Sequence, residues 1–462
     1  MFKKFFAPTD MTKGSVWKSI LTFTIPMLIG NIAQQLYSTV DTIVVGNYAQ
    51  NGDNAIAAVG SALPILNMLL VLFIGISAGA SVMVSQYFGA KNRERLSYTV
   101  GNCITVAAVC CLFLMAISAT PLLRIVLETL NTPETIIDDC WEYLTISMVG
   151  IAGMAYYNIL SGVIRGLGDS VSVLVYLLVA TVINIALDIL FVLPPLSMGV
   201  AGVALATVVS QVVSSILCLI KLARMKEHFD FGWKFMIPKK HYVKTIVNLG
   251  LPSGLTQAIF SSAMIIVQSL TNQFGEVFIA ANVIIMRVDG FAMMPNFSFG
   301  TALTTFAGQN VGAGKYDRVV KGAKQGTLIA VGTSAVITGV ILLFGKNLMG
   351  LFTSTQSLVD MSYQLMMILA VGYIAMAVTQ SLSGIMRGAG DTMTPMWISL
   401  ITTVVVRVPL AYGIAYLTSP DKVLSHGWNE SIQISLLSSW VIGALLTFIF
   451  YRVGKWKTKK LK

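Results

Sequence analysis

The sequence predicts an all-α polytopic membrane protein, with twelve transmembrane helices in two parallel-repeat six-helix bundles around a central cleft. The first observation is composition, because hydrophobic residues make up 55% of the 462-residue chain and charged residues only 11%. An average soluble domain has roughly 25% charged residues. The second observation is an internal repeat, and the third is the uneven distribution of basic residues. Together they exclude a soluble globular domain.

The repeat is centred on the pattern SGxxRGxGD followed by Ser or Thr, which closes an apolar run at 161–170 and again at 383–392. Other landmarks return in the same order at nearly the same offset: QxxGA at 86–90 and 309–313, and proline at Pro26 and Pro252. Self-similarity at a fixed offset determines the architecture of a chain. We therefore expect two homologous halves at 1–225 and 244–462, joined by a cytoplasmic linker at 226–243.

Each half contains six apolar runs of about 20 residues, the length that crosses roughly 30 Å of hydrocarbon. The first-half helices are expected at 17–46, 56–87, 98–119, 140–164, 171–193 and 199–222. Those of the second half are expected at 244–272, 278–309, 322–345, 361–386, 393–417 and 431–452. Because the number of helices in a half is even, both halves begin on the same side, and the repeats are parallel.

Basic residues are concentrated on one side of these predicted helices, which holds 26 of the 31 Lys and Arg residues. This asymmetry is the positive-inside rule, so both termini are expected in the cytoplasm and the protein in the cytoplasmic membrane. The net charge of +11 is then a sign of membrane orientation. We expect the lipid bilayer as a partner and no nucleic acid.

The first apolar run carries a polar stripe. Gln34, Tyr37 and Asp41 lie on one helical face, and Pro26 lacks the N–H that a straight helix would use, which permits a kink. A carboxylate at membrane depth costs about 2.5–3.5 kcal/mol on insertion scales, so such residues are usually functional. The stripe is expected to face a cavity, although Asp41 reaching the outer interface is the structural alternative.

A second carboxylate, Asp188, lies one turn from Asn184 in the fifth run and in the same outer part of the membrane as Asp41. Two carboxylates that share a poorly hydrated site disfavour double ionisation, so one of them should hold a proton more tightly. In the second half the position that matches Asp41 falls on Val267 or Gln268, and those that match Asn184 and Asp188 fall near Val406 and Leu410. This pattern predicts a site for a coupling ion, H⁺ or Na⁺, in the first half.

The second half instead carries Arg287 and Asp289 in one apolar run and Arg407 in another. Arginine does not deprotonate in proteins, so it cannot carry a proton. These residues are expected either to link helices by charge neutralisation or to line a substrate path. The candidates for a substrate cavity are polar or polarisable residues within apolar runs: Gln34, Tyr37, Asn158, Met264, Arg287 and Asp289.

The repeated motif places Arg165 and Asp169, and likewise Arg387 and Asp391, four residues apart at cytoplasmic helix ends among glycines. Glycine there ends a helix and permits a tight turn. A structural or hinge role is expected for both pairs and for Pro26.

Several signals for other functions are missing from the sequence. The stretch at 309–316 lacks the first Gly and the Ser or Thr of a phosphate loop. The five cysteines form no CxxC pair. We expect no enzyme activity, no metal and no cofactor.

The sequence resembles the multidrug and toxic compound extrusion (MATE) family. The motifs that carry the resemblance are Pro26, the run Asp41-Thr-Ile-Val-Val-Gly46, the QxxGA pairs, both SGxxRGxGD copies and Asn184-x-x-x-Asp188. The resemblance covers nearly the whole chain. It implies two six-helix bundles, a V-shaped cleft and a secondary antiporter that exports small lipophilic, often cationic, molecules by alternating access, and we expect a monomer.

Within that family the chain is similar to the DinF-like branch, which implies cation coupling at Asp41, Asp188, Asn184 and Thr207. The sodium-using branch has acidic residues in the seventh and tenth helices, where this chain has glutamines. The alternative function is a lipid-linked oligosaccharide or lipid flippase of the same superfamily. That function requires a basic central groove, for which the interior offers only Arg287 and Arg407.

Overall fold

The computed structural model describes residues 8–48, 52–118, 120–129, 132–458 and 461, without side-chain detail at 37–48, 52–56, 64, 455 and 458. Every regular element in this part of the chain is helical, and none is a strand. The chain divides into two compact units. Unit 1 comprises Met1–Asp10 and Ile25–Gly254, and unit 2 comprises Met11–Thr24 and Leu255–Lys462.

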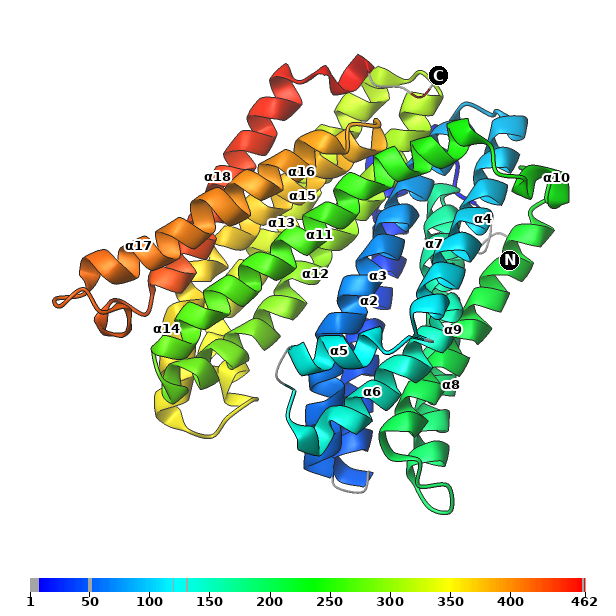
Figure 1. Ribbon diagram of the computed structural model, residues 1–462. Coiled ribbons are helices and arrows are strands. Elements are labelled where there is room, and N and C mark those ends of the chain that lie inside the picture. Colours follow the sequence, from blue (N-terminus) through cyan, green and yellow to red (C-terminus); the bar gives the residue numbers. More distant parts are fainter. Residues whose placement is uncertain (1–7, 49–51, 119, 130–131, 459–460, 462) are drawn as a thin grey trace. The chain divides into compact units, whose positions relative to one another are not determined.

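The helices follow one another with short connections (Figure 1). Those of unit 1 are α3 (Gly52–Gly89), α4 (Arg93–Ser118), α5 (Leu122–Thr129), α6 (Glu134–Val149), α7 (Ile151–Gly166), α8 (Ser170–Val192), α9 (Gly199–Arg224) and α10 (Trp233–Met236). Those of unit 2 are α12 (Glu276–Gly312), α13 (Tyr316–Gly350), α14 (Gln356–Ala370), α15 (Gly372–Gly388), α16 (Met393–Leu400), the π-helix η1 (Ile401–Arg407), α17 (Val408–Thr418), η2 (Leu424–His426), α18 (Ser431–Val453) and η3 (Lys455–Thr458).

Two helices belong partly to each unit. α2 (Val16–Tyr48) passes from unit 2 to unit 1 after Thr24, and α11 (Lys240–Gln273) passes from unit 1 to unit 2 after Gly254. Each crossing lies within one turn of a helix-interior proline, Pro26 or Pro252. The units therefore differ from the predicted halves by the exchange of the two opening segments.

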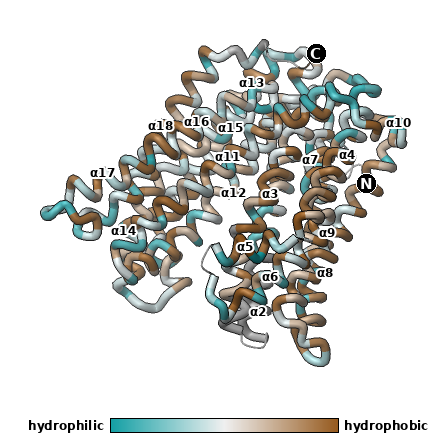
Figure 2. The backbone as a smooth tube through the Cα atoms, in the orientation of Figure 1, coloured by the Kyte–Doolittle hydropathy of each residue, from teal (hydrophilic) through white to brown (hydrophobic). Residues whose placement is uncertain are grey.

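Ten helices in the described residues are long and apolar enough to cross a membrane, and the bent pairs α6–α7 and α14–α15 bring the number to twelve. The prediction of an all-α polytopic membrane protein is confirmed. In unit 1 the hydrophobic residues follow the middle of α4, α8 and α9, and hydrophilic residues gather at their ends (Figure 2). This is the distribution that a hydrocarbon layer requires.

The sequence predicted single helices at 140–164 and 361–386, but both spans are broken. The first bends by 52° between α6 and α7 and the second by 43° between α14 and α15. At the first break Gly150 lies against Val208, and a Cβ at that position would overlap its side chain. At the second, a Cβ at Gly372 would meet the ring of Trp440 at 2.5 Å. These close contacts between helices accompany the bends, and a hydropathy pattern contains no information about such contacts.

The exchanged segments are held by backbone contacts. In unit 2 the N–H of Met11 donates to Gln309 Oε1 at 2.9 Å, and the Arg318 guanidinium donates to the carbonyl of Gly14 at 2.8 Å. In unit 1 a Cβ at Gly75 would lie 2.8 Å from the carbonyl oxygen of Gly250. The opening of α11 therefore packs backbone to backbone against α3.

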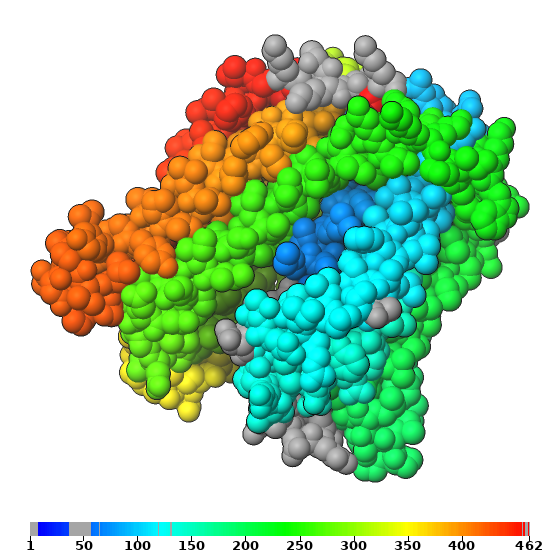
Figure 3. All heavy atoms as spheres, in the orientation of Figure 1, coloured from blue at the N-terminus to red at the C-terminus, as the bar shows by residue number. Residues whose placement is uncertain are grey.

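The α17–α18 connection projects beyond the neighbouring helices of unit 2 (Figure 3). Asp421 organises it by accepting from the Ser419 hydroxyl at 2.8 Å and by contacting His426 Nδ1 at 2.6 Å. These hydrogen bonds lower the pKa of Asp421 to about 2. The connection therefore carries a carboxylate that stays ionised in this projecting loop.

The linker between the halves is fastened to α4. The Asn102 side chain donates to the carbonyl of Phe235 at 3.2 Å and accepts from the backbone N–H of Lys239 at 2.8 Å. One turn further, the Thr105 hydroxyl donates to the carbonyl of Met236 at 2.5 Å. The linker segment at 233–239 is therefore a packed part of unit 1.

Asn102→Ala is expected to loosen this linker. The change leaves linker backbone groups without partners, which costs about 1–3 kcal/mol. Because proteolysis follows the population of the opened segment, trypsin cleavage after Lys234 and Lys239 should become about tenfold faster or more. Asn429→Ala, in the α17–α18 connection, is the matched control. Equal cleavage rates in the two variants would contradict a packed linker.

Candidate functional site

The predicted coupling residues of unit 1 come together on α8 and α9. Asn184 and Asp188 lie one turn apart on α8, and neither side chain has any exposed surface. The Asn184 amide lies 3.5 Å from the hydroxyl of Thr207 on α9, at the limit of a hydrogen bond. A carboxyl group and an amide are thus fully buried between the helices, and the half-buried Thr207 hydroxyl lies beside the amide. Oxygen ligands of this kind can hold a proton or bind a hard cation.

The remaining coupling and cavity residues predicted in the first half lie on α2 and α7. Tyr37 and Asp41 are on α2, but their side chains lie outside the described residues. Gln34, on the same helix, is exposed. The Asn158 amide donates to the carbonyl of Met154 in its own helix at 2.8 Å, so it is turned to its backbone.

The Asp residues of the repeated motif are helix caps. Asp169 accepts from the backbone N–H of Ser172 at 2.9 Å and from its hydroxyl at 2.6 Å, and it lies 2.9 Å from Lys221 Nζ. Asp391 accepts in the same way from the backbone N–H and the hydroxyl of Thr394, at 3.3 and 2.8 Å. Such caps satisfy backbone N–H groups that a helix start leaves unpaired.

The motif therefore does not form the helical Arg–Asp pairs that its spacing suggests. α7 ends at Gly166 and α15 at Gly388, so each Asp lies beyond the helix that carries its Arg. Gly168 and Gly390 adopt positive φ angles of 91° and 99°, which turn the chain between the two residues.

Unit 2 contains a cavity of about 360 Å³. Two predicted residues, Met264 and Asp289, line it together with the aromatic rings of Phe260, Phe297 and Trp440. Its polar lining comes from residues of α11, α12, η1 and α18: Gln257, Gln268, Asn282, Arg407 and Gln433. Arg287 is exposed and is not among the lining residues. The volume is in the range of sites for drug-sized ligands, about 300–1,000 Å³.

Asp289 is held in this cavity by a tyrosine. The hydroxyl of Tyr373, a fully buried residue of α15, donates to Asp289 Oδ1 at 2.9 Å. The cavity thus presents an oriented carboxyl group beside apolar and aromatic surface. Aromatic faces and thioethers suit flat or cationic lipophilic groups.

Sequence reasoning missed several of these lining residues. Asn282 on α12 and Gln433 on α18 line the cavity, and Tyr373 on α15 donates to Asp289. Nothing in their local sequence pattern distinguishes these three residues from packing residues. The charges of Asp289 and Arg407 and the thioether of Met264, all within apolar runs, mark the region in the sequence.

The comparisons with known proteins agree with this arrangement. A family model described as MatE matches residues 26–190 and again 252–413. The chain belongs to the MatE family. The match confirms the resemblance that the motifs predicted, and one matched segment lies within each predicted half.

Relatives in the MatE family extend over the same length. The chain is 29% identical to "Probable multidrug resistance protein YoeA" of Bacillus subtilis over 460 residues, which cover 97% of this chain and 96% of the relative. It is 25% identical to "Probable multidrug resistance protein NorM" of Thermotoga maritima over 471 residues, which cover 99% and 97%.

Solved structures show the MatE-family fold in this chain. An outward-facing multidrug resistance MATE family transporter of the MOP superfamily superposes with a TM-score of 0.88 at 23% identity, and 96% of this chain and 97% of that chain are covered. A MOP superfamily transporter from Pyrococcus furiosus, described as having a binding pocket of reverse polarity, superposes with a TM-score of 0.87 at 23% identity and 98% coverage of each chain. As a member of a transporter family, the protein is read as a transporter rather than an enzyme.

Proposed function

We propose that this protein is a multidrug efflux antiporter of the cell membrane, which exports lipophilic, often cationic, compounds in exchange for H⁺, or alternatively Na⁺, by alternating access. Membership of a transporter family and relatives named as multidrug resistance proteins support export of small molecules. The assignment of both termini to the cytoplasm rests only on the distribution of basic residues between the two sides of the predicted helices.

The observation that carries ion coupling is the enclosed polar group on α8 and α9. Asp188 and Asn184 are fully buried within the unit, one turn apart, and the Thr207 hydroxyl lies beside the Asn184 amide. A charged carboxylate in such surroundings costs free energy. The group is therefore stable there when it is protonated or when it binds a cation. Asp41 on α2 is assigned to the same site from the sequence.

The cavity of unit 2 supports the substrate class. Phe260, Phe297 and Trp440 offer aromatic surface, and Met264 adds a flexible thioether. The Asp289 carboxyl group can attract a cationic group of the ligand. A cavity that selects by bulk, apolar surface and charge can accept chemically diverse compounds.

The decisive experiment is efflux of a fluorescent lipophilic cation from liposomes that contain the purified protein. A proton gradient and a sodium gradient are imposed separately, and Asp41→Asn is compared with the unmodified protein. Efflux that follows the proton gradient and disappears in the variant is expected. Efflux that follows only the sodium gradient would assign the alternative ion, and efflux that needs neither gradient would contradict antiport.

A flippase is not favoured. Such a protein handles an anionic pyrophosphate headgroup, whereas the relatives are named as multidrug resistance proteins. The 360 Å³ cavity contains one carboxyl group and one guanidinium, which is a poor match for that headgroup.

A further inference from the structure

Unit 2 contains a second, smaller hollow that adjoins the larger cavity: Phe260, Met376, Arg407 and Trp440 line both. It has a volume of about 50 Å³ and lies between α11, α15, α16, η1 and α18. Arg387 and Arg407 line it, together with several hydroxyl residues, among them Thr256, Ser399, Thr402 and Thr403. We call this hollow the Arg387 crevice. None of the lining residues that the structure describes is acidic.

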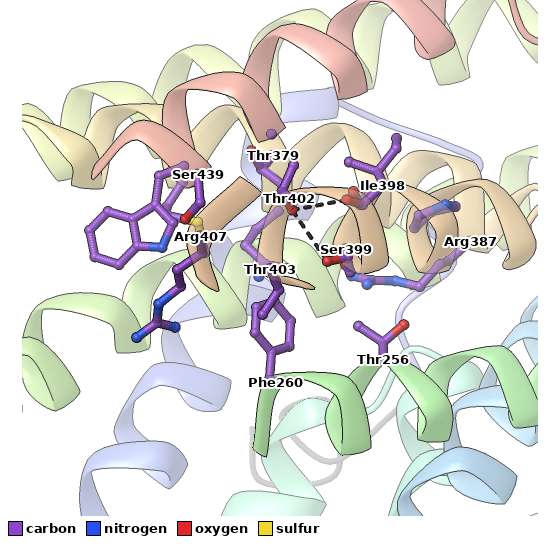
Figure 4. A pocket seen from close by; sticks show the side chains of 16 residues that line it. Thr256, Phe260, Thr379, Arg387, Ile398, Ser399, Thr402, Thr403, Arg407 and Ser439 are labelled. Carbon is purple, nitrogen blue, oxygen red and sulfur yellow. Dashed lines mark hydrogen bonds between the residues drawn. The ribbon is translucent and has the colours of Figure 1, made fainter. Parts of the chain in front are cut away.

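The Arg387 side chain extends into the crevice toward Ser399 and Thr403, and Arg407 lies at the other end (Figure 4). Arg387 is half-buried. Within the described part of the chain its guanidinium forms no hydrogen bond or ion pair. Asp391, the motif carboxylate that could have neutralised it, lies beyond the end of α15 and caps α16 at Thr394.

Arg407 does not neutralise this site but adds to its positive charge. Its Nε is buried and, among the described residues, has no hydrogen-bond partner. Its nearest acid on the other side, Asp289, belongs to the larger cavity and accepts from Tyr373. An arginine always carries its charge, and in an apolar interior that charge requires a counter-charge. Arg407 thus has Asp289 on the side of the larger cavity, whereas the described lining of the crevice around Arg387 contains no carboxylate.

The hydroxyl groups provide further donors. Thr402 donates to the carbonyl of Ile398 at 2.9 Å, which is the usual behaviour of a threonine in a membrane helix. Its neighbours Ser399 and Thr403 have no such bond within the described residues, so their protons are available to the crevice. The π-helix η1 carries both Thr403 and Arg407, and π-turns are frequent at functional sites.

We propose that the Arg387 crevice binds a small monovalent anion, such as chloride or a free carboxylate, at the Arg387 guanidinium and the hydroxyls of Ser399 and Thr403. A volume of about 50 Å³ exceeds the roughly 10–15 Å³ that admits one water, and it is far below that of a drug site. Charge-assisted hydrogen bonds from guanidinium and hydroxyl groups are the contacts that an anion requires. The proposal stands independently of ion coupling and of efflux.

The test measures binding directly. Thermal unfolding of the full-length protein in an uncharged detergent is followed while chloride, or separately acetate, replaces gluconate at constant ionic strength. Gluconate is too large for the crevice and serves as the reference anion. An anion that binds only the folded protein raises the unfolding temperature in a concentration-dependent way. A shift with chloride assigns a halide, a shift with acetate alone assigns a carboxylate, and no shift with either overturns the proposal.

Variants assign the effect to the crevice. Arg387→Gln is expected to weaken anion binding by about tenfold or more, because a charged hydrogen-bond donor is lost. Arg452→Gln, an exposed arginine near the end of α18, should keep the full shift. A shift that survives Arg387→Gln unchanged overturns the proposal.

Crystals of the unmodified protein grown in bromide give a second measurement that needs no variant. An anomalous peak beside the Arg387 guanidinium supports the site if Arg387→Gln does not fold. Bromide peaks elsewhere and none at Arg387 overturn it.

Discussion

Asp188→Asn is expected to reduce gradient-driven efflux to the rate of protein-free liposomes while the protein still folds and binds substrate. Asparagine has the size and shape of the carboxyl group that it replaces on α8, so the enclosed packing against α9 is retained. The amide, however, cannot bind or release a proton. If the Asp188 group carries the coupling ion, transport should lose its response to the gradient, and binding of a fluorescent lipophilic cation should persist.

Asp138→Asn is the matched control for this experiment. Its side chain is 78% exposed, and it lies 3.3 Å from Arg124 at the surface, so the same chemical change should leave efflux unaltered. Retained gradient-driven efflux in Asp188→Asn would remove Asp188 from the coupling site. Loss in Asp188→Asn with retention in Asp41→Asn would leave a single-carboxylate site on α8.

Gly384→Ala is expected to be strongly destabilising. Gly384 lies in the second copy of the repeated motif, on α15, and a Cβ there would overlap the carbonyl oxygen of Gly300 on α12. A backbone oxygen cannot rotate away as a side chain can, so the two helices must separate. Overpacking of this kind costs typically about 1–3 kcal/mol, which exceeds the gain of about 1 kcal/mol from the better helix propensity of alanine.

Gly339→Ala provides the control for Gly384→Ala within the same unit. Gly339 lies in the middle of α13, and a Cβ there would meet no atom within 4 Å. The control should therefore unfold at the same temperature as the unmodified protein or at a higher one. Thermal unfolding followed by tryptophan fluorescence compares the two. Equal unfolding temperatures would show that α12 and α15 tolerate a wider separation.

The sequence predicted the fold well because its signals were local or repeated. Twenty-residue apolar runs, the distribution of basic residues and the two copies of one motif each follow from short stretches of chain. The predicted proximity of Asn184 and Asp188 also followed from a local rule, because residues four apart share a helical face.

The sequence failed where structure depends on contacts between distant segments. Arg165 and Asp169 have the spacing of a helical pair, but Gly168 turns the chain between them and makes Asp169 a cap of the next helix. The sequence marked 226–243 only as a linker. Its packing against α4 was not predicted, because the bond between Asn102 and Lys239 joins residues more than 130 positions apart. The cavity around Asp289 likewise draws its walls from helices that no local pattern connects.

The exchange of opening segments between the units bears on how a chain of two homologous halves can arise. A half-length ancestor with this topology would lack the segment that its core requires, namely 240–254 against α3 or 11–24 against Gln309 and Arg318. Such an ancestor would have a complete core only as a dimer whose two chains exchange their N-terminal segments, as in domain swapping. Fusion of two such genes would place both exchanged segments in one chain, where the effective concentration of each segment is far higher than between separate molecules. Pro26 and Pro252 would then lie at the boundary between the exchanged segment and the rest of each ancestral chain.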